Sequence, residues 1–318
     1  MVSFALLCPG QGSQVIGMGA SFFHESPAAR EVFHIIDTSL RFPLSKLMFE
    51  GDMAELTRTQ NAQPALMAVS LAALRAIDSY LEDSLVSKAF CVAGHSLGEY
   101  SALTAAGSLS ISQAAILLRL RGEAMEKAVP EKQGTMAVLL GTDMDTAENI
   151  CQQAQDETNT LVVVANDNGG GQFAIAGHTQ GVEHAVTIAK GVKSVKRALL
   201  LNVSGPFHCS LMEPAALTLE QHFLGLSFLA PCVPIISNVT AQPTQDPVLI
   251  PKLLVDQTVS IVRWRESILY MAQSGVTHFI ELGSGKVLSG LVKRIYPDAV
   301  TCSVETISDI EPVLSQLF

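Results

Sequence analysis

Charged residues are scarce in this sequence, and basic ones are the scarcer kind. Lys and Arg together number 20 against 30 Asp and Glu, so the formal net charge is −10 at pH 7. Phosphate binding needs a concentrated basic surface, and we therefore expect no nucleic acid partner. Four basic residues nevertheless fall close together, at Lys190, Lys193, Lys196 and Arg197. Such a cluster is usually a solvated face, and its functional interpretation is a docking site for an acidic partner.

Paired cysteine motifs and long apolar runs are also missing. The six cysteines are scattered without Cys-x-x-Cys spacing and lie mostly in apolar segments, so we expect reduced core residues and no metal site. No stretch reaches the length that a membrane helix requires. The first apolar run, residues 2–7, has no basic leader and is ended by Pro9-Gly10. The sequence thus indicates no signal peptide and a soluble, cytoplasmic protein.

Nucleotide-binding fingerprints are absent from the glycine-rich loop that follows the first apolar run. Residues 9–14 read Pro-Gly-Gln-Gly-Ser-Gln, with no third glycine at the dinucleotide spacing and no Gly-Lys-Ser/Thr. We therefore expect neither a dinucleotide site nor a P-loop. Such a loop can instead bring a backbone N–H, here that of Gln11, close to a reacting oxygen.

What the sequence does contain is the pattern of a nucleophile elbow at Ser96. Residues 89–93 form a short apolar run typical of a buried strand, and an Ala/Leu-rich helical pattern starts at Gly98. Gly94 and Gly98 stand where any Cβ would collide with the neighbouring element in so sharp a turn. The turn exposes the Ser96 hydroxyl at a helix N-terminus, whose unpaired N–H groups favour a developing oxyanion.

A serine nucleophile needs a positioned base, most often a histidine. His208 lies in a Gly-Pro-bounded loop, whereas His95, beside Ser96, is expected to point to the opposite side of the turn. No Asp or Glu between residue 200 and His208 is a good partner for it. Two alternatives stay open: a backbone or amide carbonyl orients His208, or the base is His278 with an acid such as Asp256.

Arg121 falls on a predicted amphipathic helix over residues 112–129. An arginine on such a helix is usually a surface cation. A buried arginine, in contrast, can hold a carboxylate through two parallel hydrogen bonds. Arg121 could in that case select an acyl group that bears a free acid.

The order of predicted elements indicates a large domain interrupted by a small one. Residues 134–202 follow the order βαββαβ, the pattern of a compact ferredoxin-like domain, and α/β alternation surrounds it. We predict an α/β fold with a hydrolase-like large domain, mostly parallel in its sheet, from residues 1–129 and 201–318, and an inserted ferredoxin-like domain from residues 130–200. Within the large domain we expect helices over 65–77 and 211–226 and a strand over 231–238.

A series of motifs occurs in order along nearly the whole chain. They are Pro9-Gly10-Gln11-Gly12-Ser13-Gln14, Gln63-Pro64-Ala65, the stretch from Gly94 to Leu103, Arg121-Gly122, Phe207-His208, and Glu281-Leu282-Gly283 followed by Gly285 to Leu288. With these motifs the sequence resembles malonyl-CoA:acyl carrier protein transacylase of type II fatty-acid synthesis and the acyltransferase domains of polyketide synthases.

The resemblance implies a catalytic dyad rather than a triad. Ser96 would be the acylated nucleophile and His208 its general base. The carbonyl of Gln257 would orient the histidine, which would account for the missing acid. The N–H groups of Gln11 and Leu97 would form the oxyanion hole.

The resemblance also implies which group is transferred. Arg121 would hold the malonyl carboxylate, and Asn166 would lie near the thioester. Phe207 and Leu97 match the members that take malonyl rather than methylmalonyl groups. A bulky ring beside the acyl pocket leaves no space for an α-methyl group, although one methyl is worth only about 1–3 kcal/mol of discrimination.

The implied reaction transfers malonyl from malonyl-CoA to the phosphopantetheine thiol of acyl carrier protein, in ping-pong order through a malonyl-serine ester. Malonyl-CoA is a substrate and no cofactor is implied. We expect a monomer that supplies fatty-acid elongation, and docking of the carrier near the cluster from Lys190 to Arg197. Polyketide assembly and malonate decarboxylation use the same residues, but a chain without fused synthase domains favours fatty-acid synthesis.

Two other functions compete with this one. A serine esterase or thioesterase would release the acyl group to water, and the missing acid argues against it. A non-catalytic scaffold could keep the fold and bind the carrier through the basic cluster. The joint presence of Ser96, His208 and Arg121 argues against the scaffold.

Overall fold

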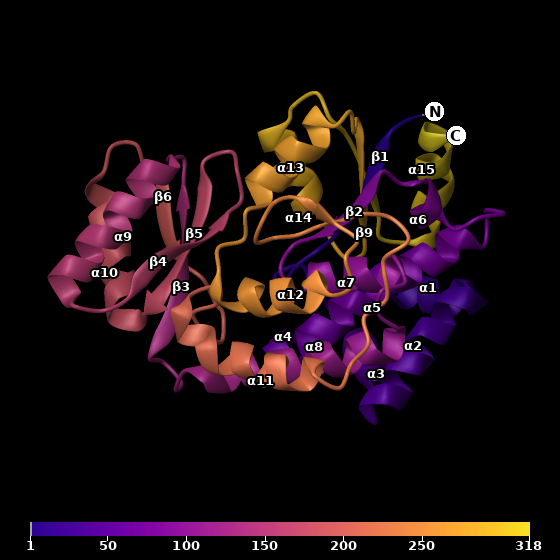
Figure 1. The fold of residues 1–318 in the computed structure, drawn as a ribbon, viewed down its shortest axis with the longest axis horizontal. Coiled ribbons are helices and arrows are strands. Elements are labelled where there is room, and N and C mark those ends of the chain that lie inside the picture. The colour runs from indigo at the N-terminus through magenta and orange to yellow at the C-terminus, as the bar shows by residue number, and fades with distance from the viewer. Residues whose placement is uncertain (1) are drawn as a thin grey trace.

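The computed structural model describes residues 2–318 and contains two β-sheets side by side (Figure 1). The larger sheet has the strand order β10 (Val300–Val304), β9 (His278–Leu282), β1 (Phe4–Cys8), β2 (Cys91–Gly94), β7 (Ile235–Ile236) and β8 (Pro243–Thr244). Its first five strands pair in parallel, and β8 pairs antiparallel with β7 at the edge. Because β1, β2 and β7 are parallel, the loops that follow them leave the same edge of the sheet.

Helices cover both faces of the larger sheet, as successive residues of β1 indicate. Leu6 packs in a core cluster with residues of the helices over 59–78 and 111–128, whereas Leu7 packs in a second cluster with residues of the helices over 264–273 and 287–295. The helices outside the smaller sheet are α1 (Ala20–Glu25), α2 (Pro27–Leu40), α3 (Leu44–Glu50), α4 (Met53–Thr57), α5 (Thr59–Asp78), α6 (Leu85–Lys88), α7 (Gly98–Ala105), α8 (Ile111–Ala128), α11 (Glu213–Phe223), α12 (Leu249–Val259), α13 (Trp264–Gln273), α14 (Val287–Ile295) and α15 (Ile310–Leu317), with 3₁₀ turns at Ser210–Met212 and Ile307–Asp309.

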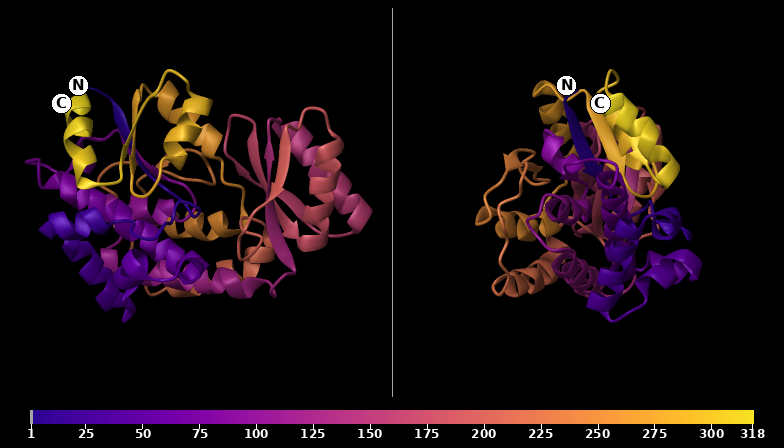
Figure 2. Two further views of the ribbon diagram at one scale, coloured as in Figure 1. Left: turned by 180° about the vertical axis from the view of Figure 1, so that it is seen from behind. Right: turned by 90° about the vertical axis from the view of Figure 1, so that its right-hand side faces the viewer.

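The smaller sheet is antiparallel, with the order β4 (Val162–Asp167), β5 (Gln172–His178), β3 (Gly134–Leu140) and β6 (Arg197–Leu200). With α9 (Met144–Thr158) and α10 (Thr179–Gly191), these strands follow the predicted order βαββαβ. They form a lobe at the end of the molecule opposite α15 (Figure 2). The α/β fold with a mostly parallel sheet is confirmed, and the division of the chain at residues 130 and 200 stays a prediction.

The two faces of the smaller sheet have different neighbours. Ala137 and Leu139 pack under α9 and α10. Met136, the residue before Ala137, points to the opposite face of the sheet. There it packs with Phe207 and Met212, which lie outside the sheet. The smaller sheet therefore turns one apolar face toward the parallel sheet and its helices.

Several element boundaries differ from those predicted. α5 starts at Thr59, so that Pro64 lies inside the helix at the cost of one backbone hydrogen bond. The strand expected over 231–238 is only Ile235–Ile236, because the prolines at 231 and 234 have no N–H to donate. α11 is shorter than expected, and α12 and β10 were not predicted.

The cysteines and the apolar helices test two further expectations from the sequence. Five of the six cysteines are buried, whereas Cys232 is exposed, contrary to the expectation that all are core residues. None of the helices within residues 2–318 combines the length and the apolar character that a membrane crossing needs.

Candidate active site

Ser96 lies in the turn that joins β2 to α7. Its backbone is left-handed, with a φ of 54°, which is unfavourable for a residue with a side chain. A Cβ on Gly94 would lie 1.9 Å from backbone atoms of Gly98, and one on Gly98 would lie 2.2 Å from the carbonyl oxygen of Cys8. The predicted strand, turn and helix are present, and the glycines let α7 begin directly against the ends of β1 and β2.

The base expected from the sequence lies within hydrogen-bond distance of Ser96. His208 Nε2 is 2.7 Å from Ser96 Oγ, and His208 Nδ1 is 2.9 Å from the backbone carbonyl oxygen of Gln257 on α12. Because a carbonyl can only accept, Nδ1 carries the hydrogen and Nε2 can accept the serine proton. The structure thus brings together all three residues named for this role.

The alternative base and acid lie elsewhere. His278 Nδ1 is 2.9 Å from Thr277 Oγ1 at the start of β9, and Asp256 Oδ2 accepts a hydrogen bond from Lys252 Nζ at 2.5 Å. Neither His278 nor Asp256 lines the cavity around Ser96. The geometry therefore favours a carbonyl-oriented His208.

The surroundings of His208 keep its imidazole neutral. Burial, followed by the nearby charge of Arg121, lowers the pKa of His208 to about 3. The Gln257 carbonyl accepts the Nδ1 hydrogen without adding a negative charge, so it opposes this shift less than a carboxylate would. His208 can therefore act as a base without first losing a proton at neutral or mildly acid pH.

Because the pKa of His208 is lowered, we expect the reactivity of Ser96 to stay nearly constant as the pH falls below 7. The rate at which an uncharged fluorophosphonate modifies Ser96 is expected to change less than about threefold between pH 7 and pH 5. With the usual histidine pKa of about 6.5, the rate would fall roughly 25-fold over that range, because protonation removes the acceptor. Following the modification by mass against pH separates the two outcomes, and a loss of roughly 25-fold by pH 5 contradicts the assigned environment.

Arg121 is buried, with only 1% of its surface exposed, so the surface interpretation of this residue is wrong. Nη1 donates to Gln63 Oε1 at 2.9 Å, and Nη2 donates to Ser96 Oγ at 3.1 Å and to Gln257 Oε1 at 3.0 Å. The guanidinium also lies over the Tyr100 ring, 5.6 Å from its centroid. Burial lowers the pKa of Arg121 from its usual value.

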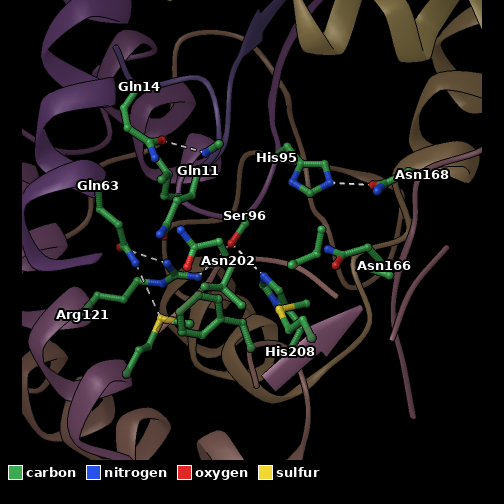
Figure 3. A pocket seen from close by; sticks show the side chains of 18 residues that line it. Gln11, Gln14, Gln63, His95, Ser96, Arg121, Asn166, Asn168, Asn202 and His208 are labelled. Carbon is green, nitrogen blue, oxygen red and sulfur yellow. Dashed lines mark hydrogen bonds between the residues drawn. The ribbon is translucent and has the colours of Figure 1, made fainter. Parts of the chain in front are cut away.

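The hydrogen-bond acceptors of Arg121 are all neutral. Within residues 2–318 no carboxylate lies at ion-pair distance from it, and its Nε–H has no acceptor. A buried cation whose charge is not balanced by a direct partner favours an anionic ligand. Arg121 thus places such a charge beside the serine hydroxyl (Figure 3).

Two backbone amides at the cavity have free hydrogens. Gln11, in the loop after β1, and Leu97, at the start of α7, both line the cavity. Among the residues that the structure describes, neither N–H donates to an acceptor. These are the two donors that the sequence resemblance assigned to an oxyanion hole, and the helix N-terminus behind Leu97 adds partial positive charge.

The cavity has a volume of about 290 Å³ and is lined both by loops that follow β1 and β2 and by strands of the smaller sheet. Asn166 of β4 and Phe207 both line it, as expected for residues near an acyl thioester. β4 is also hydrogen-bonded to the segment between α12 and α13. Asp167 N donates to Val262 O at 3.0 Å, and Val262 N donates to Ala165 O at 2.9 Å. The position of Asn166 is therefore held from both sides.

His95 differs from expectation. Its ring borders the same cavity as Ser96, rather than pointing away from it. His95 Nε2 lies 2.8 Å from Asn168 Oδ1, and the ring packs 5.4 Å from that of Trp264. Since its nitrogen is paired with Asn168 and not with Ser96, the expectation that His95 is structural remains consistent with the geometry.

Sequence reasoning missed three residues that surround the dyad. Gln63 and Glu99 stand inside motifs quoted above, but no role was assigned to them. Asn238 has a weaker signal, since it ends an apolar run that we predicted as a strand, and polar residues at the carboxyl ends of parallel strands often face a site. Among residues 2–318, no three or more His, Cys, Asp or Glu side chains are grouped so as to hold a metal ion.

Comparisons with known proteins agree with this arrangement. The family model described as "Acyl transferase domain" matches residues 5–309. A curated malonyl CoA-acyl carrier protein transacylase of Bacillus subtilis is 45% identical over 317 residues, which cover 100% of this chain and 98% of the relative.

Solved structures give the same result. The acyl-carrier-protein-S-malonyltransferase of Bartonella henselae superposes with a TM-score of 0.95 at 47% identity, covering 99% of each chain. A malonyl-transacylase solved in complex with its type II PKS acyl-carrier protein superposes with a TM-score of 0.94 at 37% identity, again covering 99% of each chain. The chain therefore belongs to the acyl transferase family, among the malonyl CoA-acyl carrier protein transacylases.

Proposed function

We propose that this protein transfers a malonyl group from malonyl-CoA to the phosphopantetheine thiol of an acyl carrier protein, and so supplies fatty-acid elongation. The observation that carries the proposal is the environment of the Ser96 hydroxyl. It lies 2.7 Å from a histidine nitrogen kept free to accept a proton and 3.1 Å from a buried arginine that has only neutral partners. A nucleophile beside a buried cation with no carboxylate at ion-pair distance among residues 2–318 suits an acyl group that ends in a carboxylate.

In the first half of the reaction, Ser96 Oγ attacks the thioester carbonyl and gives its proton to His208 Nε2. The carbonyl oxygen becomes an oxyanion that the N–H groups of Gln11 and Leu97 stabilise. Collapse of this intermediate breaks the carbon–sulfur bond, and the departing sulfur takes the proton from His208. The malonyl group is left as an ester on Ser96, and Arg121 holds its carboxylate.

In the second half, the carrier's thiol enters the same cavity and gives its proton to His208. Its sulfur attacks the serine ester, and the proton returns to Ser96 Oγ as the ester bond breaks. We infer that Arg121 orients the malonyl group for this thiol, while a half-enclosed cavity limits attack by activated water. The size of Phe207 at the cavity wall supports malonyl rather than methylmalonyl as the acyl group.

A partition assay tests this function. The protein is incubated with malonyl-CoA and phosphopantetheinylated carrier protein, and malonyl-carrier and free malonate are quantified by mass. We expect most of the malonyl group on the carrier and parallel double-reciprocal lines when both substrates are varied. Malonate release that the carrier does not affect would indicate a thioesterase, and intersecting lines would indicate direct transfer without an enzyme ester.

We also propose that the carrier docks along the basic cluster defined by Lys190, Lys193, Lys196 and Arg197. All four side chains are exposed. The strand β6 that begins at Arg197 continues into residues 201–203, which line the cavity, so the cluster leads toward the cavity mouth. Leu199 and Leu200 on the same edge strand are each 50% exposed, which adds apolar surface to the charge.

Charge reversal tests this docking surface. Lys193→Glu and Arg197→Glu are each expected to raise the KM for the carrier roughly tenfold, while the rate of Ser96 acylation by malonyl-CoA stays unchanged. Lys46→Glu, an exposed residue of α3 remote from the cavity, is the matched control and should leave both quantities unaltered. A KM for the carrier that is the same in all three variants would show that docking occurs elsewhere.

A further inference from the structure

The side chain of Asn238 reaches the elbow from beyond the end of β7. β7 pairs with β2 through Ile235 and Ile236, and the pairing stops there. Asn238, two residues farther on, is only 1% exposed. Its Oδ1 accepts the N–H of Ser96 at 2.7 Å, and its Nδ2 donates to the carbonyl of Gly94 at 2.7 Å. The side-chain amide thus continues the hydrogen-bond ladder around the turn, where the backbone of β7 cannot follow.

A second amide holds the other side of the nucleophile. Gln257 Nε2 donates to the carbonyl of Ser96 at 3.0 Å. That carbonyl and the N–H of Leu97 belong to one peptide group, so fixing the carbonyl also fixes the direction of the N–H. The two peptide groups that flank Ser96 are therefore clamped separately, one by Asn238 and one by Gln257.

The two clamps meet at Glu99 in the first turn of α7. Glu99 Oε2 accepts from Gln257 Nε2 at 2.7 Å and from the backbone N–H of Asn238 at 3.2 Å. Burial raises the pKa of Glu99 to about 7, although these hydrogen bonds and the charge of Arg121 oppose the rise. Asn238, Gln257 and Glu99 are all buried and are linked to one another by hydrogen bonds, so each side-chain amide has one favoured orientation.

This geometry matters because Ser96 has the left-handed backbone conformation described above. A residue with a side chain pays on the order of 1 kcal/mol or more for that conformation, and it persists only where the surroundings impose it. The bonds from Asn238 bridge Gly94 and Ser96, the residues at either end of the bend. Their loss would let the turn relax and move both the hydroxyl and the Leu97 N–H.

We propose that Asn238 is a positioning residue for acyl transfer, which aims the Ser96 hydroxyl and the Leu97 N–H by bridging the two sides of the elbow. Asn238 is not among the residues that line the cavity, so it acts without touching the acyl group. The identity of the substrate in this inference rests on the proposed function. The positioning of Ser96 by Asn238 should affect any acyl donor or reagent that reacts at Ser96.

The test compares Asn238→Ala with Ser237→Ala. Ser237 is the adjacent buried residue, and within the described residues 2–318 its hydroxyl accepts only a local bond, from Val239 N at 3.3 Å. For Asn238→Ala we expect the rate constant for malonyl-serine formation to fall about a hundredfold, with the KM for malonyl-CoA changed less than about threefold. For Ser237→Ala we expect wild-type kinetics. Both variants can lose thermal stability, so rates are taken per folded molecule.

Asn238→Asp adds a readout that a purely structural role would not move. A protonated carboxyl can still accept from Ser96 N–H and donate to the Gly94 carbonyl, but an ionised one can only accept and would face the Glu99 carboxylate. The rate of this variant relative to wild type should rise at least tenfold as the pH falls from 8 to 5.5. The charged or titratable groups near Asn238 are Glu99 of α7, Arg121 of α8, His208 in the loop before α11, and Arg263 and Glu266 at the start of α13.

Each outcome has a defined meaning. Wild-type kinetics in Asn238→Ala, or a rate ratio for Asn238→Asp that does not change with pH, would overturn the positioning role. If wild type itself forms no malonyl ester, the proposed substrate fails. The same variants are then compared by fluorophosphonate modification of Ser96, where the same hundredfold loss is expected and equal rates overturn the inference.

Discussion

Ser96→Ala is expected to lower the rate of malonyl transfer by about 10⁴-fold or more. The change removes the hydroxyl that His208 activates and that carries the acyl group between the two half-reactions. His208→Ala should cost about as much, and the double variant little more than either, because the two side chains act as one unit. The measurement is kcat for malonyl-carrier formation with each purified variant.

Ser101→Ala is the matched control for this prediction. Ser101 is a buried serine of α7, five residues after Ser96, and its hydroxyl has no hydrogen-bond partner among residues 2–318. Its replacement should change kcat less than about threefold. Additive losses from Ser96→Ala and His208→Ala, or more than one hundredth of wild-type activity in Ser96→Ala, would contradict the dyad.

Arg121→Ala is expected to reverse the preference for a charged acyl group. Removing one member of a buried, hydrogen-bonded charge pair costs about 2–5 kcal/mol, so kcat/KM for malonyl-CoA should fall by roughly 30- to 4,000-fold. Arg121 also contacts Ser96 and Gln257, and that part of the loss applies to every acyl group. The ratio of kcat/KM for malonyl-CoA to that for acetyl-CoA isolates the carboxylate contact, and it should drop about a hundredfold.

Arg119 provides the control for Arg121. It lies two residues earlier on α8, where it stacks over the Phe42 ring at 5.0 Å, bonds to Glu123 at 3.3 Å and donates to Asn61 of α5. Arg119→Ala removes the same charge without touching the cavity, and the acyl ratio should stay at its wild-type value. An unchanged ratio in Arg121→Ala would mean that another residue recognises the carboxylate.

The elbow could be predicted from the sequence because its determinants are local. An apolar run, two glycines and a helical pattern lie within about ten residues of Ser96, and each has a direct steric or periodic meaning. The βαββαβ order of the smaller sheet was predictable for the same reason, since each of its elements has its own periodicity. His208 and Gln257, in contrast, were assigned together only through the resemblance.

The parts that the sequence did not predict depend on contacts between distant residues. Gln257 is carried by α12, a helix with Pro251 near its start that was not predicted. Asn238 contacts Ser96 across 142 residues of chain, and nothing in the neighbourhood of either residue indicates the contact. Such pairings are fixed by the parallel order of β1, β2 and β7, which local periodicity does not determine.

One difference from hydrolytic serine enzymes follows from the dyad itself. A carboxylate partner would strongly stabilise the imidazolium form of the base, whereas the neutral Gln257 carbonyl orients the ring and stabilises that form less. The positive charge of Arg121 further disfavours a protonated His208. When a malonyl carboxylate neutralises Arg121, that opposition weakens, so we infer that His208 becomes a stronger base when the acid-bearing substrate is bound.

We propose that Ser96 carries the malonyl group between donor and carrier, and the intact mass of the protein tests this claim. The protein is mixed with malonyl-CoA, alongside Ser96→Ala, and is then chased with phosphopantetheinylated carrier protein. We predict one malonyl adduct on the wild type, none on Ser96→Ala, and complete passage of the group to the carrier thiol. An adduct that survives in Ser96→Ala, or one that decays to malonate at the same rate with and without the carrier, would contradict the claim.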